Sequence, residues 1–322
     1  MRYILLVGII LSLGLVSCDS KGNSKKNPYT IELEDYSGQL ASGFIKSIKN
    51  FPSKFVRPRN VDVWLPDSYS EDENYAVLYM HDGQMLFDVN ATWNKQEWMV
   101  DETIGSLIRE GKIQDCIVVA IWNHSEIRHS DYFPQKPFEL LPTAVKDSII
   151  EKAKRGNNHL FSEKINSDNY LKFIVEEVKP YIDANFSVYT AKEHTFISGS
   201  SMGGLISMYA ICEYPEVFGG AACLSTHWPG IMPKENNPVP AAFFDYMRQN
   251  LPDPETHKMY FDFGTETLDA FYVQYEDEVN AVLNEIGYTE ENSRNLKFEG
   301  TDHSENSWNK RFGIPVEFLL KK

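Results

Sequence analysis

Residues 199–204 read Gly-Ser-Ser-Met-Gly-Gly, which puts Ser201 at the centre of a G-x-S-x-G pattern. A serine in this pattern occupies a sharp, strained turn between a strand and a helix, and the two flanking glycines relieve the crowding. Residues 195–198 favour a strand and 205–212 favour a helix, so the context fits. We expect Ser201 to be a nucleophile and Ser200 a bystander. The alternative is a turn that only caps a helix.

The base that activates such a serine is sought among the eight histidines. In strand–turn–helix sites of this kind, the acid and then the histidine follow the serine along the chain. His303 lies in Gly-Thr-Asp-His-Ser, after the last expected strand and before the C-terminal helix, and is the predicted base. His257 precedes a strand, at the wrong end of the sheet. His227 follows a strand and is expected to line the pocket.

The acid is expected just after the strand at 258–263. Asp269 is the first candidate and Glu266 the second, and their spacing does not separate them. The alternative for Asp269 is a carboxylate that stabilises the first turn of a nearby helix.

Two backbone amides are expected to stabilise a tetrahedral oxyanion. One is the N–H of Met202, directly after the nucleophile. The other should come from the turn after the strand at 75–80, which reads His-Asp-Gly-Gln. Gln84 is the first candidate and Gly83 the second, since glycine permits a close backbone approach. The alternative is an ordinary Asp-Gly turn.

Short β-rich segments alternate with segments of helical periodicity, which predicts an α/β fold with a mostly parallel sheet covered by helices on both faces. An early segment at 39–49 indicates antiparallel strands that open the sheet. Strands are expected at 60–65, 75–80, 116–122, 194–197, 220–224, 258–263 and 295–298, and helices at 98–109, 170–184, 205–212 and 272–286.

A long polar stretch around 124–167 interrupts this alternation and is expected to be a loop insertion. It follows an apolar strand, so it should lie at the carboxyl edge of the sheet, where ligands bind in open α/β folds. Aromatic and histidine side chains that follow strands at this edge can stack on sugars or phenolic rings. The predicted substrate-binding residues are Trp122, Tyr132, His227 and Trp228.

No metal, cofactor or nucleic acid is expected. His124, Glu126, His129 and Asp131 gather in the insertion, but irregular loop spacing makes them a weak ligand set, and a solvated loop is the simpler interpretation. The sequence contains no glycine-rich phosphate loop. The formal net charge of −15 repels phosphate backbones.

Four segments of the chain together resemble the esterase family that includes esterase D, enterochelin esterases and feruloyl or acetyl-xylan esterases, with bacterial mycolyltransferases as distant relatives. They are YMHDGQMLFD, GSSMGG, FDFGTETLDAFY and FEGTDHSENSW. The resemblance covers about 61–320 and implies an α/β-hydrolase fold, a Ser, acid, His triad and no cofactor. Ser201 and His303 match the family pattern. Many relatives have an Asp where this chain has Thr267, and Glu266 and Asp269 lie on either side of it.

The segment 1–18 has the features of a bacterial lipoprotein signal peptide. Arg2 precedes an uncharged apolar run at 3–16, and Leu-Val-Ser-Cys ends at Cys18. This run is too short for a membrane span, which needs about 20 apolar residues. We expect cleavage before Cys18 and lipid attachment to its thiol. The alternative is an ordinary signal peptide with an incidental cysteine.

Residues 19–27 are polar and low in complexity, and are expected to form a flexible tether. Residues 28–322 are expected to form a single α/β-hydrolase domain. Lipid on Cys18 would hold this domain at a membrane of the bacterial cell envelope, facing the periplasm or the surface. Of the four cysteines in the chain, three remain without Cys18, and this odd number provides no complete disulfide framework.

These features predict a serine carboxylic-ester hydrolase that acts through an acyl-enzyme. The resemblance to the esterase family implies acylated carbohydrates or a siderophore ester as the substrate. Two alternatives stay open. An acyltransferase would use the same triad with an alcohol in place of water. A non-catalytic surface-binding lipoprotein would keep the fold and lack a triad member, and the presence of both Ser201 and His303 argues against it.

Overall fold

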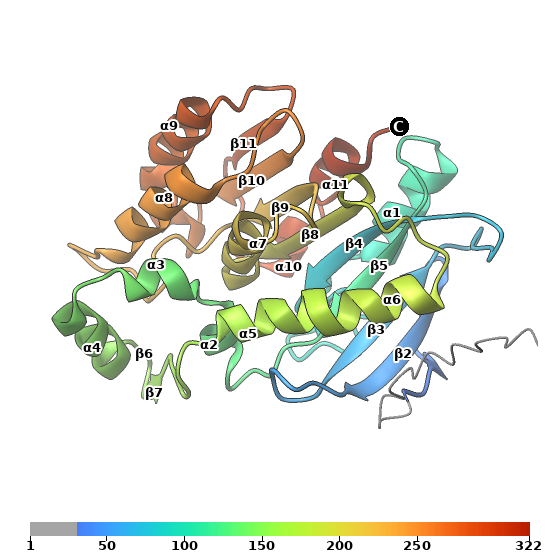
Figure 1. The fold of residues 1–322 in the computed structure, drawn as a ribbon, viewed down its shortest axis with the longest axis horizontal. Coiled ribbons are helices and arrows are strands. Elements are labelled where there is room, and N and C mark those ends of the chain that lie inside the picture. The colour runs from blue at the N-terminus through green and yellow to red at the C-terminus, as the bar shows by residue number, and fades with distance from the viewer. Residues whose placement is uncertain (1–30) are drawn as a thin grey trace, which may run out of the picture. The chain divides into compact units, whose positions relative to one another are not determined.

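A mixed β-sheet runs through the centre of the protein, with helices on both faces (Figure 1). The computed structural model describes residues 31–322, and these form one compact unit. The expected signal peptide at 1–18, the lipidation site Cys18 and the tether at 19–27 lie outside the described residues. Within 31–322, no helix combines the length and the apolar character that crossing a bilayer requires.

The sheet has nine strands in the order β1-β2-β3-β5-β4-β8-β9-β10-β11. The strands are β1 (Glu34–Asp35), β2 (Phe44–Phe51), β3 (Arg59–Leu65), β4 (Ala76–His81), β5 (Cys116–Ile121), β8 (Thr195–Ser200), β9 (Gly220–Leu224), β10 (Lys258–Gly264) and β11 (Ser293–Phe298). The six strands from β5 to β11 in the sheet order are parallel, and β1, β2 and β3 pair antiparallel at the other end. This is the α/β-hydrolase arrangement that the sequence predicts.

Helices cover the two faces of the sheet and enclose two cores. One face carries α1 (Val100–Arg109), α10 (Glu305–Trp308) and α11 (Gly313–Leu320). The other carries α5 (Ser167–Lys172), the π-helical segment η2 (Phe173–Val178), α6 (Lys179–Asn185), α7 (Met202–Glu213), α8 (Val239–Asn250) and α9 (Glu276–Ile286). The segments α5, η2 and α6 form one long continuous helix in front of the sheet (Figure 1).

Strand β4 shows why both faces must be covered. All six of its residues are buried, and successive side chains point to opposite faces. Val77 and Tyr79 join the core beneath α7, whereas Leu78 and Met80 join the core beneath α1. A strand with apolar side chains on both faces is stable only between two helical layers.

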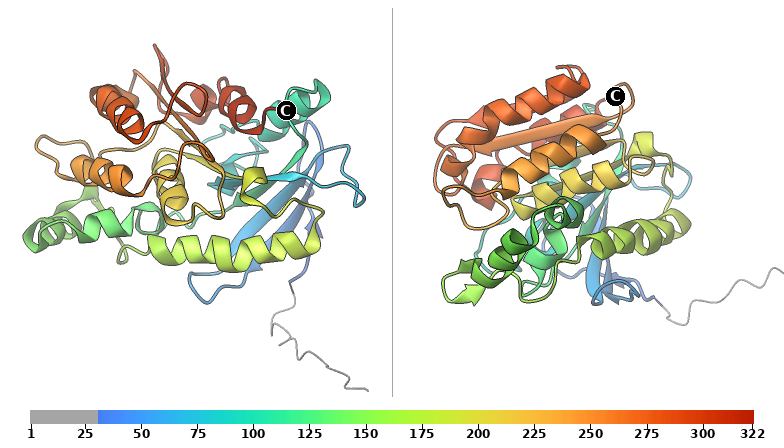
Figure 2. Two further views of the ribbon diagram at one scale, coloured as in Figure 1. Left: turned by 45° about the horizontal axis from the view of Figure 1, so that its top comes forward. Right: turned by 60° about the vertical axis from the view of Figure 1, so that its left-hand side comes forward.

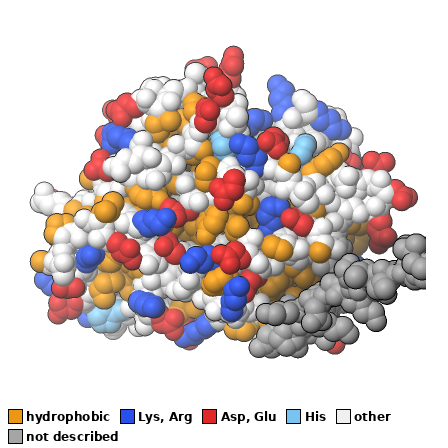
Figure 3. Space-filling view, viewed as in Figure 1, with side chains coloured by type: hydrophobic (Ala, Val, Ile, Leu, Met, Phe, Trp, Pro, Cys, Tyr) orange, Lys and Arg blue, Asp and Glu red, His pale blue; other side chains and the backbone are white. Residues whose placement is uncertain are grey.

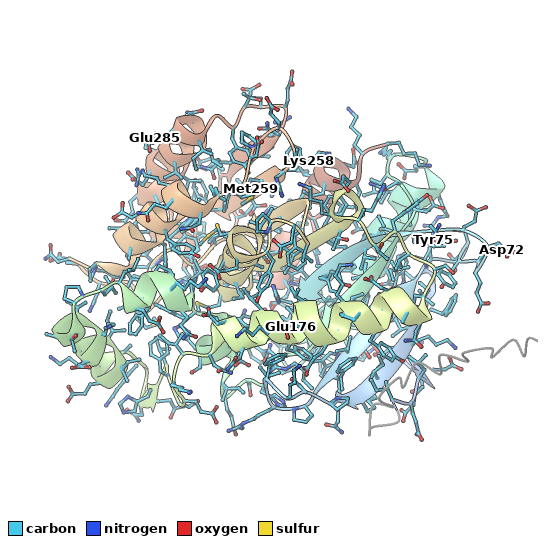
Figure 4. All side chains as sticks on the ribbon, viewed as in Figure 1. Asp72, Tyr75, Glu176, Lys258, Met259 and Glu285 are labelled. Atoms are coloured by element: carbon cyan, nitrogen blue, oxygen red, sulfur yellow. The ribbon has the colours of Figure 1, made fainter. Side chains whose placement is uncertain are left out.

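The parallel strands all end at the same edge of the sheet, opposite the edge at which they begin. Figure 4 labels Tyr75, just before β4, and Lys258, the first residue of β10, at the starting edge. The residues that follow His81, Ser200 and Gly264 therefore meet at the carboxyl edge, where α/β sheets bind their ligands.

The stretch at 124–167, expected to be a long loop, is instead largely folded. It contains α2 (Arg128–Tyr132), α3 (Gln135–Glu139), α4 (Thr143–Lys152) and a hairpin of β6 (Lys154–Arg155) with β7 (Asn158–His159). Phe133, Phe138 and Phe161 anchor it in the core beneath α7. Two of its helices have only five residues, and the third, α4, buries only Ile149, so no helical period shows in the sequence. Figure 2 shows this green region beyond one end of the long helix.

The surface carries charges of both signs. On the face seen in Figure 3, acidic and basic side chains lie interspersed among exposed apolar side chains. The three cysteines in the described part of the chain, Cys116, Cys212 and Cys223, are free and buried.

Candidate active site

Ser201 occupies the turn between β8 and α7 with φ 58° and ψ −120°, a conformation that side chains with a Cβ rarely adopt. The turn is held by hydrogen bonds from the Ser201 N–H to the Leu224 carbonyl (2.9 Å) and from the His227 N–H to the Ser201 carbonyl (3.1 Å). A Cβ on Gly199 would lie 2.8 Å from the Gly203 backbone, so only glycine fits there. Ser200 is buried inside β8.

Asp269 and His303, which lie in separate loops, form a hydrogen bond. These loops follow the parallel neighbours β10 and β11, and Asp269 Oδ1 lies 2.5 Å from His303 Nδ1. Asp269 is fully buried, whereas Glu266 is exposed. The geometry therefore favours Asp269 over Glu266 as the carboxylate that orients His303.

The second oxygen of Asp269 is held from behind by a buried polar network that the sequence analysis missed. Asp269 Oδ2 accepts hydrogen bonds from the Gly264 N–H and the Ser225 hydroxyl, both at 2.6 Å. Ser225 in turn accepts from Arg311 and from the Trp308 indole, both at 2.9 Å. With both oxygens engaged, the carboxylate has one orientation.

Arg311 connects this network to the interior of β10. It binds both oxygens of the buried Asp262, with Nη2 at 2.9 Å from Oδ1 and Nε at 3.2 Å from Oδ2. Burial raises the pKa of the Asp262 carboxyl, and the Arg311 charge and hydrogen bonds partly offset that rise. Because Arg311 lies in the C-terminal part of the chain, no local sequence pattern links it to β10.

Thr267, which lies between the two candidate acids in the sequence, has a structural role of its own. Its hydroxyl accepts a hydrogen bond from the His303 N–H (2.9 Å), and its φ is 52°. The His303 ring also packs edge-on against Trp308 (5.0 Å between ring centroids) and against Tyr272 (5.9 Å). His303 is therefore positioned through its backbone, one ring nitrogen and the contacts of its ring with Trp308 and Tyr272.

The turn after β4 approaches the start of α7, where a Cβ on Gly203 would lie 3.3 Å from the Asp82 carboxylate. The structure thus brings together the segments that contain Gln84 and Met202. A Cβ on Gly83 would lie 2.7 Å from the Ala120 backbone, which explains the glycine. The side-chain oxygen of Gln84 accepts a hydrogen bond from the Asn123 N–H at 3.1 Å. Met202 opens α7, and the first N–H groups of a helix have no acceptor within the helix.

Asp82 determines the shape of this turn. Its φ is 59°, and its carboxylate binds Arg128 through both oxygens, at 2.7 and 2.6 Å, and Asn123 at 2.6 Å. Burial alone would raise the pKa of Asp82. The charge and hydrogen bonds of Arg128, together with a hydrogen bond from Asn123, instead bring this pKa below its ordinary value. Arg128 comes from the insertion, so sequence spacing gave no sign of this contact.

Three of the four predicted substrate-binding residues pack in places that do not favour contact with a substrate. Tyr132 is fully buried behind the turn, where its hydroxyl accepts from the Asp82 N–H (3.3 Å). Trp228 is buried against Phe244, with ring centroids 4.8 Å apart. The Trp122 indole donates a hydrogen bond to a carboxylate on β3, and β3 lies three strands away from β8 in the sheet.

His227, the fourth, is buried beside the nucleophile turn. Its Nδ1 lies 2.7 Å from the Tyr272 hydroxyl and its Nε2 lies 3.0 Å from the Ile231 carbonyl. Burial, and to a smaller extent the neighbouring His129 and His303, hold the pKa of His227 well below its ordinary value. The sequence predicted His227 near Ser201. It did not indicate Tyr272, which falls at the start of the helix predicted at 272–286.

The four polar residues of the insertion are engaged separately. Asp131 pairs with the buried Arg59 (2.9 Å), and Glu126 lies 3.9 Å from Arg57. His129 bonds the Gly230 carbonyl (2.8 Å), and His124 bonds a carbonyl near β3 (2.8 Å). Among residues 31–322, no group of three or more His, Cys, Asp or Glu side chains is arranged to hold a metal ion.

A family profile described as Putative esterase matches residues 53–313 of the chain. The chain therefore belongs to this family of esterases.

Two curated proteins are similar to the chain at low identity. The chain is 23% identical to the uncharacterized protein YbbA of Bacillus subtilis over 272 residues, which cover 82% of this chain and 93% of that protein. It is 24% identical over 201 residues to an endo-1,4-beta-xylanase/feruloyl esterase of Xylanibacter ruminicola, which covers 59% of this chain and 22% of that protein.

Solved structures share the fold. A ferulic acid esterase of the anaerobic fungus Anaeromyces mucronatus superposes with a TM-score of 0.59 at 19% identity, covering 90% of this chain and 97% of that one. The enterobactin esterase of Shigella flexneri superposes with a TM-score of 0.57 at 15% identity, covering 85% and 59%. These likenesses show the α/β-hydrolase fold.

The ion pair between Arg128 and Asp82 should contribute measurably to folding. Arg128→Met leaves a buried carboxylate without its cation, so we expect the free energy of unfolding in urea to fall by about 3 kcal/mol. Arg248→Met, the matched control, removes a cation of similar exposure whose partners, Glu278 and Glu285, are about half exposed, and should cost about 1 kcal/mol or less. Equal losses in the two variants would contradict a structural role for the pair.

Proposed function

We propose that the protein is a serine carboxylic-ester hydrolase in which Ser201, His303 and Asp269 form the catalytic triad. The observation that carries the proposal is the 2.5 Å hydrogen bond between Asp269 and His303, made at the same edge of the sheet as a serine held in a strained turn. A buried carboxylate that binds one ring nitrogen of a histidine leaves the other nitrogen free to act as a base. Membership of the esterase family supports the same chemistry.

In the acylation step, His303 takes the proton of Ser201 while the hydroxyl oxygen attacks the ester carbonyl. The Met202 and Gln84 amides, with Gly83 as the alternative donor, stabilise the oxyanion. Asp269 orients the imidazole and stabilises its charged form. His303 then protonates the leaving alcohol, and Ser201 carries the acyl group.

In the deacylation step, water replaces the alcohol. His303 takes one proton from this water, whose oxygen attacks the acyl carbon, and the same amides stabilise the second oxyanion. Collapse of the intermediate breaks the bond to Ser201, and His303 returns its proton to the serine oxygen. An acyltransferase would run this step with an alcohol.

We propose acylated carbohydrates or a siderophore ester as the substrate class. Proteins with the same fold include ferulic acid esterases and an enterobactin esterase, and a curated relative is a xylanase/feruloyl esterase. The excess of acidic residues disfavours strongly anionic substrates.

We further propose that the protein is exported and held by lipid on Cys18 at a membrane of the cell envelope. The proposal is supported by the apolar run at 3–16, the small residue before Cys18 and the polar tether that follows. A lipid anchor would place the domain at the membrane without spanning it.

Replacement of the nucleophile tests the proposed reaction. We expect Ser201→Ala to lower kcat for p-nitrophenyl acetate and for a feruloyl ester by up to about 10⁶-fold, and to abolish labelling by a fluorophosphonate. Ser200→Ala, one residue earlier inside β8, is the control and should retain both. Wild-type protein that neither turns over esters nor takes the label would refute the hydrolase proposal and favour a non-catalytic binding protein.

A comparison of the two candidate acids tests the triad. Asp269→Asn removes the charge and reverses the preferred tautomer of His303, so kcat should fall by about 10⁴-fold. Glu266→Gln changes an exposed side chain and should leave kcat within about twofold of wild type. The opposite order would assign the role to Glu266.

The anchor is tested by expression in a bacterial host grown with a radiolabelled fatty acid. The wild-type chain should take up label and sediment with membranes. The Cys18→Ala chain should take up none, and recovery of the label in that variant would contradict lipid attachment at this thiol.

A further inference from the structure

Tyr272 lies between the two histidines that flank Ser201. It is fully buried, its hydroxyl contacts His227, and its ring packs edge-on against His303. The proposed triad assigns no role to this residue. The direction of the hydrogen bond between Tyr272 and His227 determines whether the Tyr272 oxygen can donate a hydrogen bond to a further group or only accept one.

That direction follows from the partner of the other ring nitrogen of His227. The Ile231 carbonyl can only accept, so Nε2 of His227 carries the hydrogen. The ring is neutral, since its pKa is held well below its ordinary value, chiefly by burial. Nδ1 is therefore a bare acceptor, and the Tyr272 hydroxyl must donate its only proton to it. The Tyr272 oxygen can then only accept hydrogen bonds from other groups.

Tyr272 also lies close to Ser201. The Ser201 hydroxyl lowers the pKa of the Tyr272 phenol, against a larger rise from burial and from the charge of Asp269. The backbone bond from His227 to Ser201 holds the two residues side by side. An acceptor thus lies next to Ser201 and in contact with the ring of His303.

We propose that Tyr272 holds the second hydrogen of the attacking water during deacylation and thereby selects water over alcohols as the acyl acceptor. The inference rests on the acyl-enzyme mechanism proposed above and extends it to the choice of acceptor. Water has two O–H bonds, one for His303 and one for Tyr272. An alcohol has a carbon in place of the second hydrogen, which would face an oxygen that can only accept.

The atoms of this step balance without a further reactant. The water oxygen bonds to the acyl carbon, and one of its protons moves to His303. The bond from the acyl carbon to the Ser201 oxygen then breaks, and the His303 proton returns to that oxygen. The second water hydrogen stays on the product acid, held by Tyr272 until the acid leaves and ionises in solvent.

The test measures how the acetyl-enzyme partitions between water and methanol. The full-length chain is given p-nitrophenyl acetate in aqueous methanol, and methyl acetate and acetate are quantified after subtraction of the Ser201→Ala background. This ratio is a property of each acyl-enzyme, so it does not depend on how much of a variant is folded. The variants are Tyr272→Phe and, as the matched control, Tyr288→Phe, another buried tyrosine, whose hydroxyl donates to the Pro252 carbonyl at 3.0 Å.

We expect Tyr272→Phe to raise the ratio of methyl acetate to acetate about tenfold, as loss of one hydrogen bond to water would do, and Tyr288→Phe to leave it unchanged. An unchanged ratio in Tyr272→Phe, or an equal change in the control, overturns the inference. If Tyr272→Phe yields no folded protein, His227→Phe decides, since it releases the Tyr272 proton, and an unchanged ratio there overturns it. Absence of Ser201-dependent turnover in the wild type would instead overturn the proposed hydrolase function, and this inference with it.

Discussion

The hydrogen bond between Asp269 and His303 is the interaction on which the rest of the site depends. It joins two loops that each leave the sheet a few residues earlier, from the neighbouring parallel strands β10 and β11. A buried carboxylate would be costly without partners, and here each oxygen is bound. Ser225, Arg311 and Asp262 extend the same network into the sheet, so the position of His303 is tied to the rigid core rather than to its own loop.

A second constraint acts on the opposite side of Ser201. The turn after β4 is held by Asp82, whose carboxylate is bound by Arg128 from the folded insertion and by Asn123 from the end of β5. Two residues that lie 41 and 46 positions after Asp82 in the sequence thus determine where Gly83 and Gln84 lie. An oxyanion site needs donors fixed before the charge develops, and a turn closed by an ion pair fulfils that requirement better than a free loop.

The hydrogen bonds around Tyr272 determine which groups in this site donate and which accept. A chain of hydrogen bonds that begins at the Ile231 carbonyl determines which way each proton points, and it leaves the phenol oxygen next to Ser201 as an acceptor. Hydrolases and acyltransferases can share one triad, so the group that meets the incoming nucleophile is where they can differ. In this protein, the buried tyrosine is the group placed to make that distinction.

The sequence by itself determined the alternation of strands and helices and the strained turn at Ser201, because periodicity and glycine spacing are properties of contiguous residues. It also placed His303 after the last strand. Only the tertiary structure separated Asp269 from Glu266, since burial and approach to His303 depend on two loops that meet in space. For the same reason, the sequence did not reveal the contacts of Arg128, Arg311 and Tyr272. It also gave no sign that Tyr132 and Trp228 are buried.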